Sequence, residues 1–119
     1  MENKRLFEGE ARFMDIIWDS EPVPSGKLVE LCRERLGWKK STTYTMIKRL
    51  SEKGLLVNEN SVVRSLVSRE EVRAMESRTV VEQTFAGSLP GFLVSFLGEK
   101  TISKEEAEEL KRMIDRYSE

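Results

Sequence analysis

Apolar residues recur at helical spacing between Lys39 and Gly54, and this pattern predicts an amphipathic helix. One side of that helix carries Thr43, Met46, Ile47 and Leu50. The opposite side carries Ser41, Thr45, Lys48 and Glu52, flanked by Thr42, Tyr44 and Arg49. The first side is suited to a core, whereas the second combines short hydroxyl side chains with cations. A surface of that kind can lie against a phosphodiester backbone and still reach the edges of bases.

Two further helices are predicted before this one. The first spans Phe7 to Asp19, with an apolar stripe that ends in Trp18, and it stops before two prolines. The second runs from Ser25, which we expect to cap it, to Leu36. Its buried stripe includes Cys32, which we interpret as a small hydrophobic residue and not as a redox sensor.

After Gly54 the pattern changes to short apolar runs that predict a β hairpin. The two strands are expected at Leu55–Asn58 and Val62–Val67, with a polar turn between them. Three helices followed by a hairpin is the order of a winged helix-turn-helix, in which the third helix enters the major groove. Arg64 is the one cation of the hairpin sequence, so the wing is expected to be weakly basic.

The remainder of the chain predicts three more helices. Ser68–Glu71 and Ser103–Glu106 both have the form of a capping box and should each open a helix. A short apolar helix is expected at Leu89–Leu97, between Gly87–Ser88 and Gly98. The fold class is therefore mainly α with a small β hairpin: a winged helix-turn-helix over residues 1–68 followed by a helical region over residues 69–119.

This second region is too small to enclose its own apolar surface. A copy of the same chain, related by a two-fold axis, is the simplest cover for it. The expected dimerisation residues are Phe85, Leu89, Phe92, Leu93, Phe96, Leu97, Leu110 and Ile114. A homodimer would present two recognition helices to the half-sites of a palindromic operator.

The charge distribution also separates a DNA-binding region from a dimerisation region. The whole chain has a net charge of −1, but residues 39–53 hold five Lys or Arg and one Glu. Residues 1–67 carry 12 basic and 10 acidic side chains, whereas residues 68–119 carry 8 and 11. We therefore expect the first region to bind double-stranded DNA and the second to stay away from it.

Candidate chemistry is sparse. The chain has no His and a single Cys, and it lacks a glycine-rich phosphate loop, so we expect no enzyme, no metal site and no cofactor. Its longest nearly apolar stretch has nine residues, Leu89–Leu97, too few to insert in a membrane, and Met1–Arg5 does not resemble a signal peptide. These features predict a cytoplasmic protein.

The expected DNA-binding residues fall into two groups. Phosphate contacts are assigned to Lys39, Lys40, Lys48, Arg49 and Arg64. Contacts near base edges are assigned to Ser41, Thr42, Tyr44 and Thr45. Alternatives remain open, because Thr42 can instead cap the helix and Arg49 can instead pair with an acid inside the domain.

The order and length of these segments resemble the BlaI/MecI/CopY family of penicillinase and methicillin-resistance repressors. The likeness lies in Ser41–Leu50 with Lys53–Leu55, and it continues through Phe85–Ser88, Phe92–Phe96 and Ser103–Leu110. The resemblance implies a homodimeric transcriptional repressor with an amino-terminal winged helix. It further implies that a membrane-bound sensor metalloprotease relieves repression by triggering cleavage within the dimerisation region.

The resemblance places the cleavage position at Ser95 and Phe96, where well-known members have Asn-Phe. The alternative is that Ser95 is an ordinary helix position and Phe96 an ordinary core aromatic. The copper-responsive branch has paired cysteines near its carboxy terminus, which this chain lacks, so copper control is not expected.

A different class of function remains open on the same fold. A winged helix can serve as a protein-interaction module without sequence-specific DNA binding, and the acidic overall balance and weakly basic wing favour that alternative.

Overall fold

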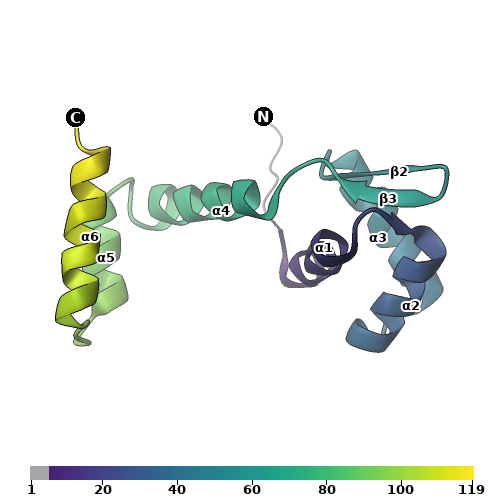
Figure 1. Cartoon of the computed structure of the whole chain (residues 1–119), viewed down its shortest axis with the longest axis horizontal. Helices are drawn as coiled ribbons and strands as arrows, with labels where there is room; N and C mark the ends of the chain where they lie inside the picture. The colour runs from purple at the N-terminus through teal and green to yellow at the C-terminus, as the bar shows by residue number, and fades with distance from the viewer. Residues whose placement is uncertain (1–5) are drawn as a thin grey trace. The chain divides into compact units, whose positions relative to one another are not determined.

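The computed structural model describes residues 6–119, so Met1–Arg5 lie outside the described part. The elements are, in order, α1 (Glu8–Ser20), β1 (Val23–Pro24), α2 (Ser25–Leu36), α3 (Lys40–Glu52), β2 (Leu56–Glu59), β3 (Val62–Ser65), α4 (Arg69–Thr84), α5 (Leu89–Leu97) and α6 (Lys104–Tyr117) (Figure 1). This is the mainly helical winged helix-turn-helix that the sequence predicts. In the described part of the chain no single helix is long and apolar enough to cross a membrane.

The chain forms two compact units, which divide between Thr79 and Val80, inside α4. The region boundary predicted from the sequence, between residues 68 and 69, coincides with the start of that helix and stays a prediction. The first unit contains α1 to α3, the three strands and the first part of α4. The second contains the end of α4 together with α5 and α6.

The first unit is built around a closed hydrophobic core. Its largest fully buried side chains are Phe13, Met14, Ile17, Leu28, Leu50, Leu55, Leu56, Val63, Thr43 and Cys32. Trp38 seals one side by stacking on Phe13, with ring centroids 5.6 Å apart. These residues come from α1, α2, α3 and the wing, so all of these elements are held by one core.

The sheet has three strands in the order β1-β3-β2, one strand more than the predicted hairpin. Strand β1 is only two residues long, and it pairs with β3 through Val23 opposite Val63. Pro24 is compatible with this position because β1 is an edge strand, where a ladder hydrogen bond is not required of every residue. The hairpin turn is made by Asn60 and Ser61, which both have positive φ angles of 53° and 63°.

One predicted cap is wrong. Ser25 is the first residue of α2 and not its cap, which is Pro24, with no side-chain hydrogen bond at the cap position. The proline fixes the backbone just before the helix, and the Ser25 hydroxyl is taken by another partner, described below. Ser68 and Glu71 form the predicted capping box: the Ser68 hydroxyl accepts from the Glu71 amide at 3.0 Å, and the Glu71 carboxylate accepts from the Ser68 amide at 3.4 Å. At the start of α6 the Ser103 hydroxyl accepts from the Glu106 amide at 3.0 Å, which is the serine half of the second box.

Candidate nucleic-acid interface

The turn between α2 and α3 determines where the recognition helix begins. Gly37 adopts a left-handed conformation, with φ of 69°, and its amide donates to the Arg33 carbonyl at 3.1 Å. The next amide, that of Trp38, donates to the Cys32 carbonyl at 3.3 Å. This pair of bonds is the glycine-based helix ending that allows α3 to start almost at once, at Lys40.

Helix α3 has a buried side and an exposed side, as its sequence predicts. Thr43, Met46, Ile47 and Leu50 are buried in the core. All eight predicted DNA-binding residues of this segment are exposed: Lys39, Lys40, Ser41, Thr42, Tyr44, Thr45, Lys48 and Arg49. The structure therefore brings these eight side chains onto one solvent-facing surface, which we call the α3 face.

The cations of the α3 face are available to a ligand. Within residues 6–119 no acidic side chain lies within ion-pair distance of Lys39, Lys40, Lys48 or Arg49. The alternative that Arg49 pairs with an acid inside the domain is therefore not what the described part of the chain shows. Unpaired cations on a convex helix are the arrangement that phosphate contacts require.

Lys53, the fifth cation of the same segment, is paired inside the protein. Its ammonium lies 3.1 Å from the carboxylate of Glu10, whose side chain is only 3% exposed. The same ammonium lies 5.4 Å from the centre of the Phe7 ring. Lys53 is thus a structural cation that joins the end of α3 to α1, and the positive charge of the interface comes from the other four.

Two hydroxyl groups of α3 are used inside the protein. The Tyr44 hydroxyl donates to the Ser25 hydroxyl at 3.1 Å, which ties the first half of α3 to the start of α2. Thr43 is fully buried, and its hydroxyl donates to the Lys39 carbonyl at 3.4 Å. Thr42 caps nothing, because the cap of α3 is Lys39, with no side-chain hydrogen bond there. Ser41, Thr42 and Thr45 are therefore the exposed hydroxyl side chains of the α3 face.

The wing contributes little charge. Arg64 is exposed on β3 and lies 3.6 Å from the Glu59 carboxylate on the neighbouring strand. An exposed ion pair of this kind is weak, so the guanidinium can exchange its partner for a phosphate.

Cys32 is fully buried, as predicted for a small hydrophobic residue on the apolar stripe of α2. Burial raises the pKa of its thiol, while Thr43 and Arg35 act in the opposite direction to a smaller extent. A thiol with a raised pKa is less ionised at neutral pH and therefore less reactive. Among residues 6–119 no cluster of His, Cys, Asp or Glu side chains is arranged to hold a metal ion.

The second unit presents a contrasting, apolar surface. None of the side chains in residues 80–119 is buried. Of the predicted dimerisation residues, Phe85, Phe92, Leu93 and Leu97 are half-buried, and Leu89, Phe96, Leu110 and Ile114 are exposed. Phe92 lies between two other aromatic rings, with centroid distances of 5.5 Å to Phe85 and 5.8 Å to Phe96.

The residues of the predicted cleavage position lie in the last turn of α5. Ser95 is exposed, and 70% of Phe96 is exposed. Phe96 is therefore not a core aromatic in the single chain.

Sequence reasoning missed the polar contacts that join distant segments. Glu10 belongs to an apparently ordinary acidic first turn, and nothing in its spacing indicates a buried ion pair with Lys53. Trp18 packs against the core while remaining partly buried, and its indole N–H also donates to the Val67 carbonyl at 3.0 Å, a bond that the apolar stripe does not predict. Such pairs depend on tertiary contacts across 43 or 49 residues, which periodicity does not report.

Comparison with known proteins gives a consistent family. Residues 7–116 match the model of the family described as penicillinase repressor. The methicillin resistance regulatory protein MecI of Staphylococcus aureus is 24% identical over 122 residues, covering 98% of this chain and 99% of the relative. A penicillinase repressor of Bacillus licheniformis is 20% identical over 117 residues, covering 95% and 91% of the two chains.

Proposed function

Because the chain belongs to the penicillinase repressor family, whose members are DNA-binding transcriptional regulators and not enzymes, we propose that it represses transcription as a homodimer bound to a palindromic operator. The observation that carries this proposal is the α3 face. Four cations and three hydroxyl side chains, none of them paired with another side chain within residues 6–119, share one exposed side of a helix whose other side is fixed in the core.

In this proposal the cations position the protein and the hydroxyl groups read the sequence. Lys39, Lys40, Lys48 and Arg49 contact phosphates on either side of the major groove, and Arg64 reaches a phosphate from the wing. The short side chains let α3 approach the bases closely. Their hydroxyls pair with base edges, and the threonine methyl groups contact thymine.

Tyr44 has a narrower role than the other residues assigned to base edges. Its hydroxyl already donates to Ser25, so it is the exposed edge of the ring that meets the DNA. Apolar contact with a thymine methyl group is the interaction available to such an edge. The bond to Ser25 also fixes the first half of α3 against α2, which favours a single docking geometry.

The apolar surface of the second unit supports the dimer. Phe96 and Ile114 are 70% and 53% exposed, which is costly for a chain alone in water. A second copy covers the same residues on both partners through a two-fold axis. The dimer then carries two α3 faces, and the operator is expected to repeat with inverted symmetry, one helical turn or a multiple of it apart.

We further propose that proteolysis at Ser95–Phe96 relieves repression, with a sensor metalloprotease as the source of the signal. Both residues are exposed and lie one turn or less from Gly98, where α5 ends, so local unwinding exposes the bond. A cut there separates α6 from the rest of the chain. Dimer affinity falls first, and operator affinity follows because two linked half-site contacts become independent.

The test of DNA recognition is a charge reversal on the α3 face. Lys48→Glu is compared with Lys100→Glu, a matched reversal at an exposed position outside α3, in titrations onto duplex DNA at low salt. We expect Lys48→Glu to lower affinity at least tenfold, since it removes one phosphate contact and adds a repulsion, and Lys100→Glu to change it less than about twofold. Equal affinities for the two variants would support a protein-interaction module and exclude the α3 face as the DNA contact.

A further inference from the structure

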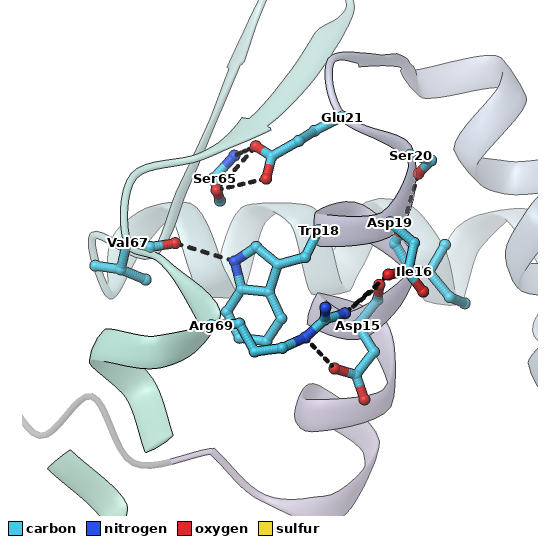
Figure 2. A network of polar contacts seen from close by, with 9 residues as sticks. All are labelled: Asp15, Ile16, Trp18, Asp19, Ser20, Glu21, Ser65, Val67 and Arg69. Carbon is cyan, nitrogen blue, oxygen red and sulfur yellow. Dashed lines mark hydrogen bonds and ion pairs between the residues drawn. The ribbon is translucent and has the colours of Figure 1, made fainter. Parts of the chain in front are cut away.

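The segment that leads out of the wing into α4 is fastened to one end of α1. Figure 2 shows three separate contacts. The Glu21 carboxylate accepts from the Ser65 amide at 2.7 Å and from its hydroxyl at 2.8 Å. The Trp18 indole donates to the Val67 carbonyl at 3.0 Å, and Arg69 completes the series. The partners on this segment are Ser65, Val67 and Arg69, which lie within a stretch of five residues. The three contacts therefore hold the backbone between the wing and α4 in place.

Arg69 is the contact that reaches α4 itself, because it is the first residue of that helix. Its guanidinium lies 2.9 Å from the carboxylate of Asp19 and 3.3 Å from that of Asp15. It also lies over the Trp18 ring, 5.3 Å from the centre (Figure 2). Hydrogen bonding to Asp19 is the largest cause that raises the pKa of Arg69, which agrees with a guanidinium held by acids.

The first turns of α4 also contain a buried side chain and a hydrogen bond to Leu6, which precedes α1. Val72 is 6% exposed, and the Glu76 carboxylate accepts from the amide of Leu6 at 3.4 Å. The capping box of Ser68 and Glu71 closes the start of the helix. Residues 69–79 of α4 belong to the first unit and are therefore held to its other elements. The Arg69 latch, which we define as Arg69 with Asp15, Trp18 and Asp19, lies at the base of this helix.

A small change in the direction of α4 at its first residue becomes a large displacement of its last residue. The helix runs unbroken from Arg69 to Thr84, a length of about 24 Å at 1.5 Å per residue. A swing of about 10° about its first residue would move its end by about 4 Å, more than the ~3.4 Å rise of one base pair. The direction of α4 therefore matters at the scale on which half-sites are spaced.

We propose that the Arg69 latch sets the half-site spacing that the dimer accepts, by fixing the direction in which α4 leaves the DNA-binding unit. Arg69 is a positioning residue in this account and touches no DNA. The inference rests on the proposed function, in which the second units join two copies, and adds a determinant of specificity outside the α3 face.

The test uses the full chain and compares Arg69→Ala with Arg78→Ala, the same substitution at an exposed position further along α4. The probes are the duplex that the unaltered chain enriches from a random pool, variants with one or two base pairs added or removed between its half-sites, and a single half-site. Amide hydrogen exchange of residues 66–76 without DNA is measured in parallel.

For Arg69→Ala we expect faster exchange at residues 66–76, affinity for the single half-site within about twofold, and a loss of roughly tenfold at the preferred spacing. The dependence on spacing should flatten, while Arg78→Ala retains the profile of the unaltered chain. Unchanged exchange would show that the latch does not hold α4. Faster exchange with an unchanged spacing profile would overturn its role in specificity. If the unaltered chain enriches no inverted repeat, the proposed function itself fails and the spacing role with it, whereas the exchange result still reports whether the latch holds the helix.

Discussion

The two units of this chain differ in how they treat their apolar side chains: the first buries them, and the second leaves them at least partly exposed. Residues 6–79 enclose large side chains such as Phe13, Leu28 and Leu50 with no exposure at all. Residues 80–119 bury no side chain, although α5 is mostly apolar and α6 carries an apolar stripe. The first unit is complete by itself, whereas the second reaches a comparable state only when something covers it. The difference supports the proposal that folding stability resides in the first unit and assembly in the second.

The sharpest test of this difference is the same substitution in both units. Leu50→Ala removes a fully buried side chain and should lower the free energy of unfolding of the first unit by about 2–5 kcal/mol. Leu89→Ala, at a side chain that is 55% exposed, should change that free energy by less than about 0.5 kcal/mol. Urea unfolding followed by tryptophan fluorescence reports the first unit, since Trp18 and Trp38 both lie there. Equal losses for the two variants would remove the distinction.

The next test places a charge on the apolar surface of the second unit. Ile114→Asp should weaken self-association by about 2 kcal/mol or more, which is roughly 30-fold, because a carboxylate is then desolvated in the interface. Lys111→Asp, on the same helix, is the matched control for a new acid. Sedimentation equilibrium over a range of concentrations measures both. Unaltered self-association in Ile114→Asp would mean that this side of α6 is not covered by a second copy.

A third comparison separates the two kinds of cation within one basic segment. Lys53→Ala strands the buried Glu10 carboxylate and should destabilise the protein by about 2 kcal/mol. Lys48→Ala should leave stability within about 0.5 kcal/mol and instead weaken DNA binding. Thermal unfolding and DNA titration of both variants give the two readouts. The account is contradicted if Lys53→Ala proves as stable as Lys48→Ala.

The smallest expected effect concerns Cys32, whose thiol pKa is raised by burial. The unfolded chain releases this proton at a lower pH than the folded protein does, so the stability that it contributes is complete below the ordinary thiol pKa of about 8.5 and is lost as the pH rises above it. The free energy of unfolding of the unaltered chain should therefore fall more steeply above that pH than that of Cys32→Ala. Parallel slopes for the two proteins would show that the buried thiol does not titrate differently on folding.

Much of the fold follows from local sequence. Helical periodicity predicts α2 and α3 to within about a residue of their observed bounds, because the apolar stripes of both helices face one core. Capping boxes at Ser68 and Ser103 marked the starts of α4 and α6 through short-range hydrogen bonds. The exposed side of α3 was predictable for the same reason, since the buried side fixes which residues remain outside.

The rest depends on contacts between distant residues. Strand β1 is a two-residue element next to a proline, and it exists only because β3 lies beside it. Ser25 carries a typical capping residue type, but Pro24 takes the cap and Tyr44 takes the hydroxyl. The division of the basic segment into free cations and the paired Lys53 requires the position of Glu10, which lies 43 residues away. Periodicity and spacing carry no signal for such pairings.

The most direct measurement of the central claim is selection of binding sites by the full chain from a pool of random duplexes at two salt concentrations. The account predicts that an inverted repeat is enriched and that affinity for it falls steeply with salt, since several lysine and arginine contacts displace counterions from the phosphates. Enrichment of a single undivided site would contradict the dimer, and no enrichment at either salt concentration would contradict operator binding by the α3 face.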